Sequence, residues 1–156
     1  MELPDYGVIG DLAPEIRQSL ASRGKFETLN SGHAVITQGQ PHGSFSVVLS
    51  GKLRVSVHAH GDLVVLAEFK PGEIVGEMCV IDPQNASADV VVSDRAADLW
   101  TIEDKEFNRL VEEDPAKGFE VMKVLARALC RRLRHNSDSM LRREETVRDH
   151  YRDNDY

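Results

Sequence analysis

The sequence predicts an α+β domain in which a compact β-barrel or roll lies between helical ends. The spacing of apolar residues changes from helical to alternating near Lys25, and it returns to helical after Ile102. Between these points, glycines separate short β-branched runs at the intervals expected for turns in a barrel or roll. The chain has 156 residues, of which 41% are apolar, so it is long enough for one domain with its own core.

The first 24 residues predict an N-terminal helical segment. Asp11 is an N-cap candidate, Pro14 falls in the first helical turn, and Gly24 ends the helix. The roll is expected over residues 25–102. Its β-branched runs are residues 33–37, 45–50, 52–58, 63–69, 87–92 and 96–102. The tripeptides 50–52 (Ser-Gly-Lys) and 60–62 (His-Gly-Asp) predict hairpin turns.

Residues 103–147 predict a short helix, from Glu103 to Glu113, followed by a long helix that begins at Asp114-Pro115. Apolar side chains recur on the long helix in steps of three and four, at Met122, Leu125, Leu129, Leu133 and Met140, with Asn136 inside the stripe. About 30 helical residues extend ~45 Å, which is more than the roll alone can cover. We therefore expect a parallel homodimer through this helix, with Asn136 fixing its register. The polar residues 148–156 predict a frayed tail.

Charge and composition exclude several classes of protein. The net charge of −7 argues against a general nucleic-acid binder. The stretch from Arg127 to Arg143 is an exception, because it holds six arginines and one acid. We expect this stretch to be solvated or paired with acids from a neighbour, and the alternative is that it binds nucleic acid or an anionic membrane. No apolar run is long enough to span a membrane, and the N-terminus does not resemble a secretory signal. Cys79 and Cys130 are expected to be buried, reduced thiols in a cytoplasmic protein.

No catalytic constellation is present in the sequence, so we expect a protein that is not an enzyme. The chain lacks a GxSxG elbow, a P-loop and an HExxH motif. His58 and His60 share one face of a predicted strand, and His60 adjoins a turn, so exposure explains this pair better than a metal site. We expect no metal.

The most informative segment runs from Pro71 to Val92, with the sequence PGEIVGEMCVIDPQNASADVVV. It places a glycine and an acid, Gly76-Glu77, beside a turn, which is how a backbone pocket for a small ligand is often built. The segment resembles the phosphate-binding cassette of cyclic nucleotide-binding domains. The order of elements is similar too, and the resemblance covers roughly residues 10–142. It implies an eight-stranded antiparallel β-roll with an N-terminal helix and a long C-terminal helix.

The resemblance also implies a set of ligand-binding residues. Glu77 matches the acid that binds the ribose 2′-hydroxyl, although a carboxylate at this position also suits the cap of the short helix that follows. The cassette arginine that pairs with the cyclic phosphate falls on Ala86. The resemblance places the remaining cassette contacts at Gly76, Met78, Cys79, Ser87 and Ala88. It places contacts to the base at Asn136 and Ser137 of the long helix of the dimer mate.

Alanine at position 86 removes a charge-assisted contact to phosphate, so tight binding of cyclic AMP or cyclic GMP is not expected. We expect a stand-alone regulatory module with a degenerate cassette that signals to, or scaffolds, a protein partner. The alternative is a genuine sensor of a cyclic nucleotide or another small molecule, with an altered pocket or with an arginine supplied from elsewhere. Arg54 and Arg95 are expected on the surface. No helix-turn-helix for DNA binding is expected after the long helix.

Overall fold

The structure is a computed structural model that describes the backbone of residues 2–153 and the side chains of residues 2–137. Helices flank eight strands, as the fold class predicted. In chain order the elements are η1 (Ile9–Asp11), α1 (Pro14–Ala21), β1 (Lys25–Asn30), β2 (Ala34–Ile36), β3 (Ser44–Ser50), β4 (Leu53–Ala59), β5 (Asp62–Phe69), β6 (Ile74–Val75), α2 (Glu77–Ile81), β7 (Asp89–Val92), β8 (Ala96–Glu103), α3 (Asp104–Glu113) and α4 (Pro115–Asp153).

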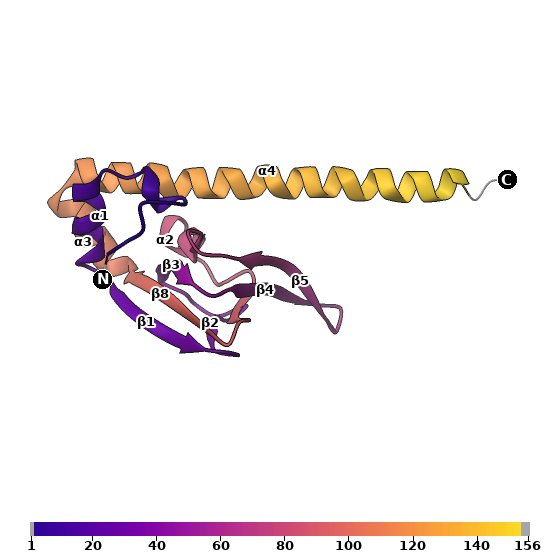
Figure 1. The fold of residues 1–156 in the computed structure, drawn as a ribbon, viewed down its shortest axis with the longest axis horizontal. Coiled ribbons are helices and arrows are strands. Elements are labelled where there is room, and N and C mark those ends of the chain that lie inside the picture. The colour runs from indigo at the N-terminus through magenta and orange to yellow at the C-terminus, as the bar shows by residue number, and fades with distance from the viewer. Residues whose placement is uncertain (1, 154–156) are drawn as a thin grey trace.

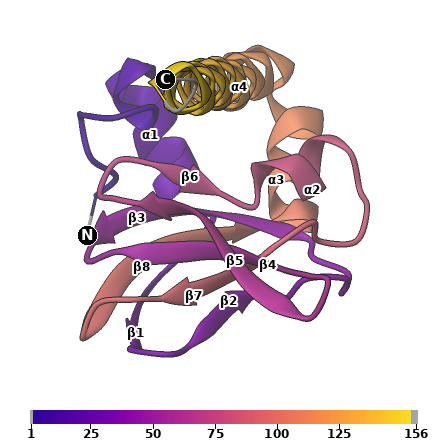
Figure 2. The same ribbon diagram turned by 90° about the vertical axis from the view of Figure 1, so that its right-hand side faces the viewer.

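The strands form two four-stranded antiparallel sheets, which together make the β-roll. One sheet has the order β1-β8-β3-β6 and the other has the order β2-β7-β4-β5. Every strand pairing among the described residues is antiparallel. Figure 2 looks along α4, which lies over the roll, with α1 below one side of α4 and α3 below the other.

Only one of the two predicted hairpin turns is a hairpin. The turn at His60 and Gly61 joins the paired strands β4 and β5, and both residues have positive φ values, 54° and 92°. The turn at Gly51 instead connects β3 in one sheet to β4 in the other. The prediction of a hairpin at 50–52 is therefore wrong. The positive φ of Gly51 allows the chain to turn from one sheet into the other.

Aromatic rings and the first turns of α4 build the core between the roll and the helices. The Phe45 ring packs edge-on against Trp100 and Phe107, at centroid distances of 5.9 and 5.7 Å. The indole N–H of Trp100 donates a hydrogen bond to the carbonyl of Ala21, 3.2 Å away, which ties α1 to β8. The α4 side chains in this core are Val121, Val124, Leu125 and Ala128.

Asp114 and Pro115 begin α4 as predicted. The Asp114 carboxylate accepts a hydrogen bond from the backbone N–H of Lys117, 3.1 Å away. Hydrogen bonds from the side chain and the backbone N–H of Lys117 lower the Asp114 pKa from its ordinary value. For α1 the proline is in place, but its N-cap is Ala13, which has no side-chain cap, so Asp11 does not cap it.

Helix α4 extends well past the roll, as Figure 1 shows. It continues to Asp153, beyond the predicted end at residue 147 and into the segment that we expected to fray. Leu125 has no exposed surface and packs in the core of its own domain, so its assignment to a dimer face is wrong. Leu133 is 66% exposed. The side chain of Met140 lies outside the described residues.

Candidate functional site: the cassette and helix α4

The segment from Pro71 to Val92 folds as a turn, the short strand β6, the one-turn helix α2, a loop and β7. Gly76 lies between β6 and α2 in the left-handed conformation, with φ 85°. A Cβ at this position would lie 2.5 Å from the Ser44 carbonyl oxygen and 2.8 Å from Nε2 of His42. The backbone here therefore requires glycine, which fixes the direction in which α2 leaves the sheet.

The carboxylate of Glu77 is completely buried at the start of α2. Its Oε1 pairs with Nη1 of Arg132 at 2.6 Å. Its Oε2 has no hydrogen-bond partner among the described residues. Burial raises the Glu77 pKa from its ordinary value, and the positive charge of Arg132 partly opposes that rise. Glu77 is thus an enclosed carboxylate with one oxygen paired and the other free to accept a donor.

Arg132 reaches Glu77 from helix α4, which lies across the roll. Its Nη2 also donates to the Ile74 carbonyl at 2.8 Å, and its guanidinium stacks on the Phe69 ring, 4.5 Å from the centroid. One side chain of α4 therefore joins β5, β6 and α2. No sequence pattern considered above pointed to this arginine as a site residue. A signal was available, because Arg132 continues the spacing of the buried residues 121, 125 and 128 in steps of four, three and four.

A cavity of about 240 Å³ lies between the cassette, the sheet that contains β4 and β7, and α4. The structure brings most of the sequence-predicted ligand residues to its wall, namely Gly76, Glu77, Met78, Cys79, Ala86, Ser87, Ala88 and Asn136. Ser137 does not line this cavity, and its hydroxyl donates to the Leu133 carbonyl of the same helix. Whether these residues bind a ligand stays a prediction.

Ala86 occupies the wall position that the resemblance gives to the cassette arginine. Only 6% of its surface is exposed. Its backbone N–H donates to the Gln40 carbonyl, and its carbonyl accepts from Gly39 N–H, at 2.9 and 2.8 Å. The cassette loop is thereby fastened to the loop before β3. Backbone hydrogen bonds hold the loop in place, and the Ala86 side chain supplies no charge to the cavity.

No arginine from the roll replaces the missing cation. Arg54 and Arg95 are exposed and do not line the cavity. Asp89, next to the cassette loop, accepts a hydrogen bond from Gln38 N–H at 2.7 Å and lies 3.5 Å from His58 Nε2. Among the described residues that line the cavity, the charged ones are Glu77 and Arg132, and they pair with each other.

The arginine-rich part of α4 is used at least partly within its own domain. Arg132 pairs with Glu77, and Arg131 pairs with Asp11 at 3.3 Å. Both acids belong to the same chain, whereas the sequence predicted a solvated stretch or one paired with acids from a neighbour. Arg142 and Arg143 lie outside the residues whose side chains are described.

The cysteines differ from the prediction of buried thiols, because Cys130 is exposed and Cys79 is half-buried. Burial and the nearby Glu77 charge raise the Cys79 pKa. Within the described part of the chain, no three His, Cys, Asp or Glu side chains are grouped as metal ligands. The helices of that part include none that is both long enough and apolar enough to cross a bilayer.

Comparison with known proteins agrees with this geometry. The family model of the cyclic nucleotide-binding domain matches residues 26–114, more than half of the chain. The Pycsar effector protein XpPycTIR of Xanthomonas perforans is 28% identical over 134 residues, which cover 86% of this chain and 42% of that protein. Glutaminase 1 of Bradyrhizobium diazoefficiens is 30% identical over 132 residues, which cover 85% of this chain and 21% of that protein.

Among solved structures, a cyclic nucleotide-binding domain from Methylobacillus flagellatus KT superimposes with a TM-score of 0.80 at 25% identity, covering 86% of this chain and 75% of that one. The chain spans less than half the length of each of the two curated relatives. The match to the family model and the shared β-roll give one conclusion: this chain belongs to the cyclic nucleotide-binding domain family.

Proposed function

We propose that this chain is a regulatory module whose cassette is degenerate for cyclic nucleotides and whose output is the position of α4. The proposal depends on two residues of the cavity wall, Ala86 and Arg132. Ala86 gives the cavity no cation, and the cation that is present, Arg132, is held by Glu77. A cyclic phosphate entering this cavity would meet no unpaired positive charge among the described lining residues.

The same ion pair supports a route from the cavity to a partner. Arg132 belongs to α4, and its partners belong to β5, β6 and α2, so a change in the cassette reaches the helix through one side chain. The helix then continues past the roll (Figure 1). Its far part is a suitable contact for a partner protein or an attached domain. In this role the chain regulates another protein and performs no catalysis itself.

Titration calorimetry with cyclic AMP, cyclic GMP and a cyclic dinucleotide tests the proposal. The protein is expected to show no binding tighter than micromolar. Ala86→Arg is expected to gain affinity for cyclic AMP by about 30-fold or more, because a buried charge pair to phosphate is worth about 2–5 kcal/mol. Ala86→Gln, which adds a polar but neutral side chain, is the control and should gain little. Submicromolar binding by the unaltered protein would refute the degenerate cassette.

A further inference from the structure

Strand β5 lies at one end of its sheet, which has the order β2-β7-β4-β5. Among the described residues it pairs with β4 alone, and no backbone hydrogen bond outside that pairing involves residues 63–68. The four side chains from Leu63 to Leu66 are between 42% and 57% exposed. Residues 63–67 contain no charge and no proline, which are common protections of an edge strand, and the pairing with β4 shows one bulge, at Leu66. A long apolar edge of this kind is suited to pairing with another strand.

The turn of the β4–β5 hairpin indicates which backbone groups face this open edge. Both residues of the turn have positive φ, as in a type I′ turn, and the residues that flank such a turn form a hydrogen-bonded pair. Ala59 and Asp62 are that pair, and hydrogen-bonded pairs alternate along an antiparallel ladder. By this alternation Val64 bonds to β4, whereas Leu63 and Val65 present their N–H and C=O groups to the edge.

A groove of about 860 Å³ follows the same edge beside α4. Six consecutive residues of β5, 64–69, line it. Because successive side chains of a strand point to opposite faces, a space that touches all six runs along the edge of the strand and not over one face. One strand residue occupies ~160 Å³, from ~4.8 Å between strands, ~10 Å between layers and a rise of ~3.3 Å. The groove therefore has room for about five residues of one extended segment.

The α4 side of the groove is basic, with the side chains of Arg131, Arg132 and His135. Arg131 lies 3.3 Å from Asp11, but both side chains are exposed, and exposed ion pairs contribute little to stability. The acids that line the groove, Glu68 and Glu73, are already engaged, one with a lysine side chain and the other with a backbone N–H. An acidic side chain on a bound segment would therefore complement the α4 side.

We propose that the edge of β5 binds an extended strand of a partner protein, about five residues long, in which apolar residues alternate with acidic residues that face α4. The strand extends the sheet through the outward backbone groups of Val65, and its acids contact Arg131. Residues 7–8 and 71–74 also bound the groove, which leaves room for a single segment and not for the edge of a second roll. Figure 1 shows the β4–β5 hairpin projecting from the roll in the same direction as α4. The inference goes beyond the proposed function and does not depend on what the cassette binds.

Fluorescence anisotropy of a labelled peptide, Thr-Val-Glu-Val-Glu-Val-Thr, titrated with the full chain tests the proposal. We expect saturable binding at micromolar concentration, and binding at least tenfold weaker for the peptide with lysine in place of glutamate. Arg131→Glu should remove this preference, because it reverses the charge that the peptide meets. Arg109→Glu makes the same change at an exposed arginine of α3 outside the groove, and it should leave the preference within about twofold.

Val65→Pro tests the backbone contact. Proline removes an outward N–H that makes no bond to β4, so the variant should fold and should bind the peptide at least tenfold more weakly. Val65→Thr keeps the N–H and is the control, with affinity expected within about threefold of the wild type. Methylated peptides give a second measurement that needs no variant of the protein. Only one edge of an added strand pairs with β5, so methylating the backbone nitrogens of either the three valines or the two glutamates should abolish binding, and the other pattern should preserve it.

Three results would overturn the proposal. The first is the absence of saturable binding by the glutamate peptide. The second is an equal effect of the two methylation patterns, which would show that side chains alone make the contact. The third is a Val65→Pro variant that binds the peptide normally but has a different mass from the wild type in light scattering, which would assign the edge to a second copy of this chain. None of these results bears on cyclic AMP binding by Ala86→Arg, so the two proposals are tested separately.

Discussion

Glu77 illustrates how one side chain ties the stability of this domain to its chemistry. Burial removes its carboxylate from water, and Arg132 replaces only part of that hydration. The second oxygen remains without a donor among the described residues. A fold built for stability alone is often served as well by an apolar residue at such a position.

The raised Glu77 pKa predicts a pH dependence of stability. Because the folded protein holds this proton more tightly than the unfolded chain, the contribution of Glu77 to stability is fully present below its unfolded pKa of 4.5. It is lost as the pH rises through the higher folded pKa. Between about pH 7 and about pH 5, the free energy of unfolding of the wild type should thus increase relative to that of Glu77→Gln. Urea denaturation of both proteins at each pH measures this difference. A difference that stays constant or shrinks on acidification would contradict the assignment.

Gly76 provides a second test at the residue scale. Gly76→Ala should destabilise the fold by about 3–5 kcal/mol, because alanine must adopt a positive φ and its Cβ would overlap the Ser44 carbonyl. Gly39→Ala is the control. Gly39 has a similar φ of 78°, but nothing lies within 4 Å of the added Cβ, so its cost should be only about 1–2 kcal/mol. Equal costs in urea denaturation would show that the close approach at Gly76 is unimportant.

The sequence was informative about the cassette and less so about Arg132, the residue that pairs with Glu77. Gly76, Glu77 and Ala86 were recognisable because they are close in sequence and follow a known local pattern. Arg132 lies 55 positions after Glu77 and meets it only after α4 folds back across the roll. No local pattern encodes that meeting. The spacing of Arg132 on the buried side of α4 was the one available indication.

At the scale of elements, the attachment of α4 to the cassette depends on Arg132. Arg132→Met should remove the ion pair and the hydrogen bond to Ile74, and it should leave Glu77 as an uncompensated buried charge. We expect roughly tenfold faster amide hydrogen exchange in α2 and in α4 near residues 128–137. Arg131→Met breaks an exposed pair on the same helix and should have little effect. If both variants exchange alike, Arg132 does not hold the helix.

Strand pairing was the least predictable feature of the fold. Alternating β-branched runs predicted six of the strands, but β1 is largely polar and exposed and β6 has only two residues, so neither gave a periodic signal. The crossing at Gly51 looked like a hairpin because glycine turns serve both arrangements. The sheet to which a strand belongs is decided by contacts distant in sequence, such as β1 with β8.

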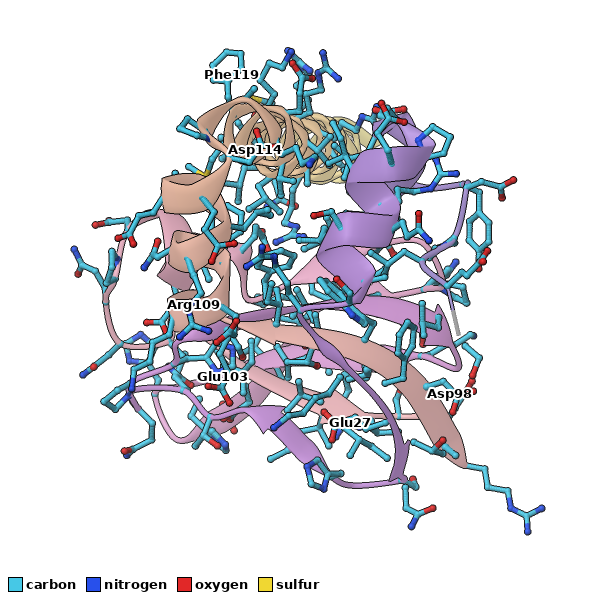
Figure 3. The ribbon with its side chains drawn as sticks, turned by 90° about the vertical axis from the view of Figure 1, so that its left-hand side faces the viewer. Glu27, Asp98, Glu103, Arg109, Asp114 and Phe119 are labelled. Atoms are coloured by element: carbon cyan, nitrogen blue, oxygen red, sulfur yellow. The ribbon has the colours of Figure 1, made fainter. Side chains whose placement is uncertain are left out.

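At the scale of the whole molecule, α4 has a second stripe beside the face that packs on the roll. The residues in heptad spacing are Phe119, Met122, Ala126, Leu129 and Leu133. Met122 also packs partly against the core, and Asn136, the next position in this spacing, lines the cassette cavity. Phe119 is 61% exposed, and Figure 3 shows it projecting outward from the start of the helix. This outer stripe differs from the predicted one by using Ala126 in place of the buried Leu125. A groove of about 860 Å³, partly lined by Val64, Val65 and Leu66 of β5, lies beside α4.

The outer stripe predicts a parallel dimer in which Leu133 contacts its counterpart. Leu133→Glu should convert a species of twice the 17.4 kDa chain mass into a monomer at micromolar concentration, because it places two like charges at an apolar seam. Light scattering after size-exclusion chromatography measures the mass. Leu63→Glu makes the same change at another exposed leucine, near the β4–β5 turn, and should leave the mass unchanged. A monomeric wild type, or a Leu133→Glu variant that remains dimeric, would show that the heptad stripe serves a different partner.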